Sequence, residues 1–167
     1  VATGDDEVRE QVRRLIKEGA DYIKVTATGG TTATSFPLLP SFNVEELSTL
    51  VETAHDLGKL TAAHCSSIQG TINSLDAGMD MIIHCIFKGA DGSDAFRTDV
   101  VDRIAETGTY VNPTLQVHRA RIWTLLNQKA EYGLDESLQI ELDHAQRNFE
   151  QHMEDCRRML GMGVRMI

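Results

Sequence analysis

Three short apolar stretches decide the fold of this chain: Ala20-Asp-Tyr-Ile-Lys-Val-Thr26, Leu60-Thr-Ala-Ala-His-Cys65 and Met81-Ile-Ile-His-Cys85. Each follows an amphipathic segment that stops at a glycine, which is the pattern of a helix leading into a buried strand. Strands that alternate with helices form a parallel sheet, and the carboxyl ends of its strands share one edge. Lys24, His64 and His84 lie at or near those ends. The spacing therefore predicts that one amine and two imidazoles meet at a single edge.

The same alternation extends over the rest of the chain. Apolar spacing and capping residues predict six helices: one from a cap at Thr3 to Gly19, one from a capping box at Asn43 to Gly58, and others over 68–77, about 99–107, 115–132 and 136–160. Five strands are predicted, over 20–26, 60–65, 80–85, 109–112 and after Gly163. The fold class is α/β with five parallel strands, and right-handed crossovers make it an open sheet or part of a barrel. No repeat or linker interrupts the alternation, so residues 1–167 are predicted to form one domain.

Composition narrows the classes of partner and compartment. The formal net charge of -9 argues against nucleic acid, whose phosphates need a basic face. No apolar run approaches the roughly 18 residues of a membrane span, so no membrane contact is expected. The three cysteines are irregularly spaced, which favours a reducing compartment, and we expect a cytoplasmic protein. The chain opens at Val1 and closes on a strand-like run over 164–167, which predicts truncation at both ends.

The histidines at the strand ends are candidate metal ligands. Neighbouring residues of a strand point to opposite faces, so His64 and Cys65 diverge, as do His84 and Cys85. If the edge faces a pocket, the imidazoles are the ligands and the thiols pack as small apolar groups. Two satisfied core histidines are the alternative. The core interpretation is less favoured, because both imidazoles occupy equivalent positions of adjacent strands, beside a strand that carries a lysine.

Lys24 lies between isoleucine and valine, although lysine is rarely buried unless it is paired or modified. A desolvated amine loses its proton more readily and then reacts with carbonyl carbon. It could form a Schiff base with a substrate, or take up carbon dioxide and become a carbamate that bridges two cations. A lysine that extends its amine to the mouth of the sheet is the third interpretation.

The remaining histidines are expected to be helix-surface or packing residues; they are His55, His118, His144 and His152. His118 comes nearest to the predicted pocket, because the segment after the fourth strand would overhang it.

Several segments in order carry a resemblance to a known family: residues 19–25 with Gly29 and Gly30, Glu45-Glu-Leu47, Ala54-His55, Thr61-Ala-Ala-His64, 77–84 and Asn112-Pro-Thr114. In order and spacing, the chain resembles the metal-dependent amidohydrolase superfamily. The match is with its imidazolonepropionase-like and Xaa-Pro dipeptidase-like branch, and it extends from Gly19 to about Leu115.

The resemblance implies a TIM-like (β/α)8 barrel of which this chain is the C-terminal part, supplying strands four to eight without the first strands. It implies that Lys24 is carboxylated and bridges two divalent ions, with His64 and His84 as ligands of the second. Zinc is the expected metal. The implied reaction is hydrolysis of a C–N bond in a small substrate such as a dipeptide, an N-acyl amino acid or a cyclic amide.

Two departures from the family pattern matter. The His-x-His pair of the first strand is absent, and no His-x-His occurs in this sequence. The aspartate that ends the eighth strand would follow residues 164–167, where the sequence given stops. The chain is therefore expected to be an incomplete fragment with little or no turnover of its own.

Two rival functions remain open. The segment 20–29 also looks like the active-site strand of a Schiff-base (class I) aldolase with Lys24 as nucleophile. Those enzymes carry a second lysine on the next strand, whereas here Lys59 precedes that strand and would lie at its opposite end. The other rival is a non-catalytic half-barrel whose unpaired edge strands make it a homo-oligomer, a dimer or larger.

Overall fold

The computed structural model describes residues 4–30 and 36–167, so the expected cap at Thr3 lies outside the described residues. Within that range helices and strands alternate as predicted until two consecutive helices near the end. In chain order the elements are α1 (Asp5–Lys17), β1 (Ile23–Val25), α2 (Val44–Asp56), β2 (Thr61–Cys65), α3 (Ile68–Asp76), β3 (Met81–His84), α4 (Thr98–Thr107), β4 (Tyr110–Asn112), α5 (Leu115–Tyr132), α6 (Glu136–Gly161) and β5 (Arg165–Met166).

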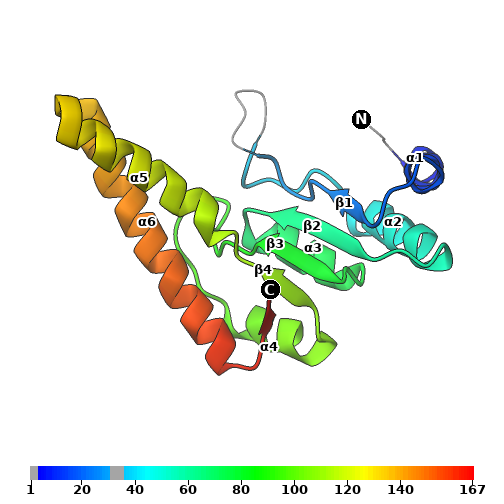
Figure 1. The fold of residues 1–167 in the computed structure, drawn as a ribbon. Helices are drawn as coiled ribbons and strands as arrows, with labels where there is room; N and C mark the ends of the chain where they lie inside the picture. The colour runs from blue at the N-terminus through cyan, green and yellow to red at the C-terminus, as the bar shows by residue number, and fades with distance from the viewer. Residues whose placement is uncertain (1–3, 31–35) are drawn as a thin grey trace.

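The strands form one parallel sheet in the order β1-β2-β3-β4-β5 (Figure 1). Neighbours in the chain are neighbours in the sheet throughout, which is the arrangement of a barrel wall, whereas a doubly wound sheet reverses its strand order. The prediction of an α/β fold with five parallel strands is confirmed. Strands β1 and β5 lie at the two edges, as the sequence predicted.

Strand β1 is shorter than predicted. Pairing with β2 begins at Ile23, whose N–H donates to the carbonyl of Leu60 over 2.9 Å, and the strand ends at Val25. Tyr22, which the prediction included, is 54% exposed. The apolar run overestimated the strand because β1 has a partner on one side only, so its flanks lack the second ladder that would extend it.

Capping explains why α2 begins where it was predicted. The Asn43 side chain accepts the N–H of Glu46 over 2.8 Å, and the Glu46 carboxylate accepts the N–H of Asn43 over 3.1 Å. This reciprocal pair satisfies two backbone donors that the first turn of a helix leaves unpaired.

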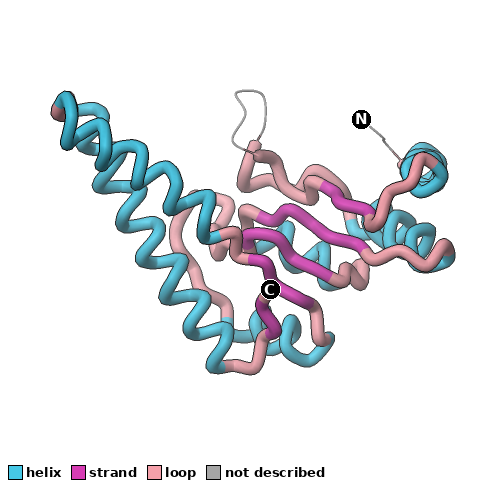
Figure 2. The backbone as a smooth tube through the Cα atoms, in the orientation of Figure 1, coloured by secondary structure: helices cyan, strands magenta, loops and turns pink. Residues whose placement is uncertain are grey.

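The two faces of the sheet differ in what covers them. Helices α2, α3 and α4 pack on one face, with α1 beside α2 (Figures 1 and 2). Register places Ile23, Ala63, Ile82 and Val111 on that helix-covered face, and all four are buried.

The opposite face is open. It carries the exposed Lys24 and Tyr110, and a cavity of about 380 Å³ lies over Met81 and Ile83. A second copy of the chain could cover this face, and association of copies stays a prediction.

Helices α5 and α6 form an antiparallel pair that extends away from the sheet (Figure 2). Their bounds agree with the predicted 115–132 and 136–160 within one residue. The pair has its own apolar cluster around Leu125 and Leu142, separate from the main core. In the part of the chain that the structure describes, no helix has both the length and the apolarity to cross a bilayer.

The cysteines pack in the core, as predicted. All three belong to the described residues, and each is buried and free of a disulfide. Burial raises the pKa of the Cys65 thiol to about 11, although hydrogen bonds with Ser74 and Thr71 act the other way. Such a thiol stays protonated at neutral pH and is a poor metal ligand.

Asp80 joins three elements at the amino end of β3. Its Oδ2 accepts the N–H and the hydroxyl of Thr61, each over 2.7 Å, and lies 2.8 Å from Nε2 of His55 on α2. Partial burial by itself raises the pKa of Asp80, but the hydrogen bonds from His55 and Thr61 outweigh it and leave that pKa below its usual value. His55 is therefore a helix-surface residue whose imidazole has a defined partner.

Replacing Asp80 by asparagine is expected to lower the free energy of unfolding by about 1–3 kcal/mol, because an amide presents an N–H where Thr61 needs an acceptor. Asp76→Asn is the matched control: it removes an exposed ion pair with Arg103, which is worth about 0–1 kcal/mol. The Asp80 contribution is present above the ordinary carboxyl pKa and is lost as pH falls through the lowered one. Urea unfolding at neutral and acid pH measures both effects, and equal losses in the two variants would contradict this role.

Candidate metal centre

The two strand-end histidines meet at the carboxyl edge of the sheet. His64 lies near the end of β2 and His84 ends β3. Their ring centroids are 4.5 Å apart with an interplanar angle of 79°, and both side chains are partly buried. The structure thus brings together two of the three predicted site residues.

Lys24 lies on the same face of the sheet as His64. It pairs with Ala62 in the parallel register, and His64 follows two residues further along β2 on that face. The positive charge of Lys24 contributes to lowering the pKa of both His64 and His84, so its amine is electrostatically coupled to the pair. Lys24 itself is exposed on the open face, and a flexible four-carbon stem carries its amine.

The expectation that the histidines occupy equivalent positions is wrong by one residue. Register pairs His64 with Ile83 and Cys65 with His84. Strict alternation would therefore send the His84 side chain toward the helices, on the side of Cys65.

The backbone at the end of β3 corrects that offset. His84 has φ 70° and Cys85 has φ 53°, both in the left-handed region that residues other than glycine seldom adopt. The imidazole of His84 then lies against His64, while Cys85 is buried in the core. Such conformations cost on the order of 1–3 kcal/mol each and persist where the surroundings enforce them, often at functional sites.

Both imidazoles are neutral at pH 7. Burial is the main reason that the pKa of His84 falls to about 4, and the nearby His64 and His118 lower it further. Burial also lowers the pKa of His64, although a hydrogen bond with the backbone of Gly29 acts in the opposite direction. A neutral imidazole is the form that binds a metal ion.

The loop after β1 supports His64. The hydroxyl of Thr28 accepts the N–H of Ser66 over 2.8 Å, and the Ser66 hydroxyl lies 3.1 Å from Nε2 of His64. Gly29 is required for close approach, because a Cβ at that position would come within 2.6 Å of the Phe36 carbonyl oxygen. Gly29 therefore lets the backbone after β1 pass close to Phe36.

The turn after β4 supports His84. The Thr114 hydroxyl lies 2.5 Å from Nδ1 of His84, so the opposite ring nitrogen, Nε2, is directed away from Thr114. The Asn112 side chain accepts the N–H of Thr114 over 3.1 Å, which fixes the turn.

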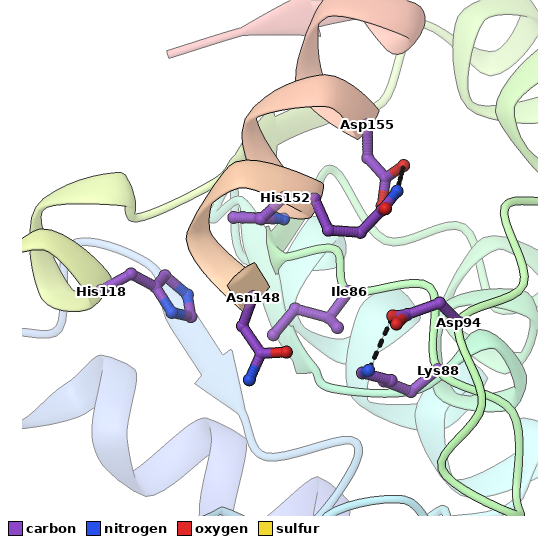
Figure 3. A pocket seen from close by; sticks show the side chains of 8 residues that line it. Ile86, Lys88, Asp94, His118, Asn148, His152 and Asp155 are labelled. Atoms are coloured by element: carbon purple, nitrogen blue, oxygen red, sulfur yellow. Dashed lines mark hydrogen bonds and ion pairs between the residues drawn. The ribbon is translucent and has the colours of Figure 1, made fainter. Parts of the chain in front are cut away.

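A cavity of about 110 Å³ lies between the segment that follows β3 and helices α5 and α6 (Figure 3). His118 of α5 and His152 of α6 line it, with ring centroids 5.2 Å apart, and the ion pair of Lys88 and Asp94 closes another side at 2.7 Å. The charges of both histidines contribute to lowering the pKa of His84.

These residues suit a metal ion in part. Two neutral imidazoles stand edge to face, and Nε2 of His84 is directed away from its hydrogen-bond partner. Across residues 4–30 and 36–167, no group of three or more His, Cys, Asp or Glu side chains could hold an ion. Among the described residues a third ligand would have to be a side chain of another kind, and an unmodified ammonium cannot serve because it has no lone pair.

The sequence interpretation missed Thr114 as a residue of this site. Thr114 was noted only as part of the Asn-Pro-Thr segment, and its position directly after a predicted strand was the signal that could have identified it. His152 was expected to lie on a helix surface or pack, and it is buried with Nε2 3.0 Å from the Pro113 carbonyl. His118 faces the cavity, as its place after the fourth strand suggested.

Comparison with known proteins identifies the family of this chain. The profile of the Amidohydrolase family matches residues 1–167. Ochratoxinase of Aspergillus niger is 35% identical over 85 residues, which are 50% of this chain and 18% of that protein.

Two crystal structures match over nearly the whole chain. That of A. niger ochratoxinase has a TM-score of 0.77 at 24% identity, over 99% of this chain and 34% of that one. A Xaa-Pro dipeptidase with methionine bound in its active site has a TM-score of 0.76 at 28% identity, over 99% and 38%. The chain thus spans about a third of the length of these solved relatives. The match over its full length makes this chain a member of the amidohydrolase family.

Proposed function

We propose that this chain supplies part of the centre of a metal-dependent hydrolase that cleaves C–N bonds in small substrates such as dipeptides, N-acyl amino acids or cyclic amides. Lys24, His64 and His84 are its metal ligands, with Lys24 acting as a carbamate and zinc as the preferred ion. The observation that carries the proposal is the contact of two neutral imidazoles at the carboxyl ends of adjacent parallel strands.

The location of the candidate ligands at the carboxyl edge of the sheet favours this function. Enzymes built on parallel barrels have their active sites at the carboxyl ends of the strands. Family membership supports hydrolysis, and the dipeptidase that holds methionine in its active site supports a small substrate with amide character. The cavity lined by His118 of α5 and His152 of α6 offers polar side chains to part of such a substrate.

Each ligand has a distinct task. His64 and His84 donate neutral nitrogen lone pairs, and their burial excludes competing protons near pH 7. Carboxylation of the Lys24 amine replaces a positive charge with an anion that carries two oxygen ligands. A bound divalent ion would polarise the scissile carbonyl and lower the pKa of water.

The chain alone is an incomplete centre in this proposal. Its sequence contains no His-x-His pair, and within the described residues no carboxylate joins His64 and His84 as a third ligand. We therefore expect the isolated chain to bind an ion without efficient turnover.

The aldolase alternative is tested by borohydride reduction in the presence of a carbonyl substrate. Lys59 precedes β2 and so lies at the end of the strand opposite His64. No labelling at Lys24 is expected, and irreversible labelling there would favour the Schiff-base function.

Zinc binding to the 167-residue chain is the test of the proposed centre. Isothermal titration at pH 7 is expected to give one site, and His64→Ala or His84→Ala to weaken it by more than about tenfold, or 1.4 kcal/mol. His144→Ala is the matched control, because that imidazole is exposed on α6. Equal affinity in the wild type and both strand-end variants would contradict the assignment.

Bicarbonate tests the role of Lys24. Because a carbamate forms from the amine and carbon dioxide, added bicarbonate is expected to tighten zinc binding by the wild type and not by Lys24→Arg. Lys17→Arg on α1 controls for loss of a lysine elsewhere. A bicarbonate effect that survives Lys24→Arg would remove this residue from the ligand set.

A further inference from the structure

Thr114 makes an unusual contact for a residue that begins a helix. It is the N-cap of α5, and a threonine there ordinarily accepts a backbone N–H from the first turn. The Thr114 side chain makes no such capping bond. Its hydroxyl instead lies 2.5 Å from Nδ1 of His84, a residue 30 positions earlier in the chain.

The backbone of Thr114 is also unusual. Its φ of 51° and ψ of 37° lie in the left-handed region, which a β-branched residue very rarely adopts. Thr114 thus makes no capping bond and has a strained backbone. Its hydroxyl contacts His84 instead.

Two groups on opposite sides hold this conformation. The Asn112 side chain accepts the N–H of Thr114 over 3.1 Å. His152, which is buried on α6 and labelled in Figure 3, donates from Nε2 to the carbonyl of Pro113 over 3.0 Å. The peptide between Pro113 and Thr114 is therefore anchored to His152 of α6, which lies 39 positions after Pro113 in the chain.

We propose that Thr114 is a positioning residue that holds His84 in the tautomer with the proton on Nδ1, so that Nε2 presents its lone pair to a metal ion. His152 acts through the Pro113 carbonyl and keeps the Thr114 hydroxyl within reach. The inference rests on the proposed function, because a metal ion at Nε2 is what selects the direction of the hydrogen bond between His84 and Thr114.

The direction of the hydrogen bond between Nδ1 of His84 and the Thr114 hydroxyl determines whether Nε2 can bind a metal ion. If Nδ1–H donates to the Thr114 oxygen, Nε2 is unprotonated and can bind an ion. If the Thr114 hydroxyl donates to Nδ1, the ring proton resides on Nε2, and that nitrogen cannot be a ligand. Only the first arrangement is compatible with a metal ion on the Nε2 side of the ring.

Imidazole nitrogen NMR separates the two arrangements without any metal. In the ¹⁵N-labelled, metal-free chain at pH 7, long-range proton–nitrogen correlations are expected to give His84 a pyrrole-type Nδ1 and a pyridine-type Nε2. His84→Asn assigns these signals by their loss. A wild-type spectrum with the His84 proton on Nε2 would overturn the proposal.

Variants of Thr114 test the cause of the tautomer. Thr114→Val keeps the shape and removes the hydroxyl, so the proton is expected to shift toward Nε2, whereas Thr114→Ser is expected to keep the wild-type pattern. Thr124→Val on α5 is the matched control, because its hydroxyl bonds only its own helix at Ala120. An unchanged tautomer in a folded Thr114→Val variant would overturn the role of the hydroxyl.

Zinc titration completes the test. Thr114→Val is expected to lower zinc affinity by roughly 10- to 100-fold, the usual effect of losing a hydrogen bond to a metal-binding histidine, and Thr114→Ser is expected to restore it. Loss of affinity in both variants would indicate a merely structural role and overturn the proposal. A wild-type chain with the predicted tautomer and no zinc binding would instead overturn the proposed function and leave the tautomer assignment in place.

Discussion

The left-handed backbone at His84 and Cys85 is the constraint on which the candidate centre depends. The sheet register aligns His84 with Cys65, so a regular strand would direct this imidazole into the helix-covered core. Two successive positive φ angles bring the imidazole beside His64 and place the Cys85 thiol in the core. A strained backbone of this kind persists only where neighbouring residues hold it in place. Both His84 and Cys85 have such neighbours.

That support comes from three residues that lie far from the bend in the chain. Cys85 is buried beside Met159 of α6, with the two sulfur atoms 4.0 Å apart. Thr114, at the start of α5, contacts the His84 ring, and His152 of α6 fixes the turn that carries Thr114. The end of the α5–α6 pair that lies next to the sheet therefore helps to position the strand-end histidines.

The general fold could be predicted from the sequence because its signals are local. Apolar runs, glycine stops and the capping box of Asn43 each depend on residues within a few positions, and the elements they predicted are present. The sequential order of the strands agrees with the tendency of consecutive elements to be neighbours in space. The length of β1 was overestimated, because the number of neighbouring strands with which a strand pairs is not encoded locally.

The candidate site was only partly predictable for the same reason. The types of its central residues, lysine and histidine after apolar runs, were visible in the sequence. The one-residue offset between His64 and His84 was not, because register depends on how two strands pair and alternation assumes regular backbone. The roles of Thr114 and His152 arise from contacts that span 30 and 39 positions, and no local pattern encodes such pairs.

The central claim is that two imidazoles brought together by a strained strand end share one ion on the face that carries Lys24. Anomalous diffraction at the zinc absorption edge, from crystals of the chain grown with zinc, tests it most directly. The account predicts a single strong peak at about 2.0–2.1 Å from one nitrogen of each of His64 and His84. A zinc peak bound by other residues, with these two rings free of metal, would contradict it.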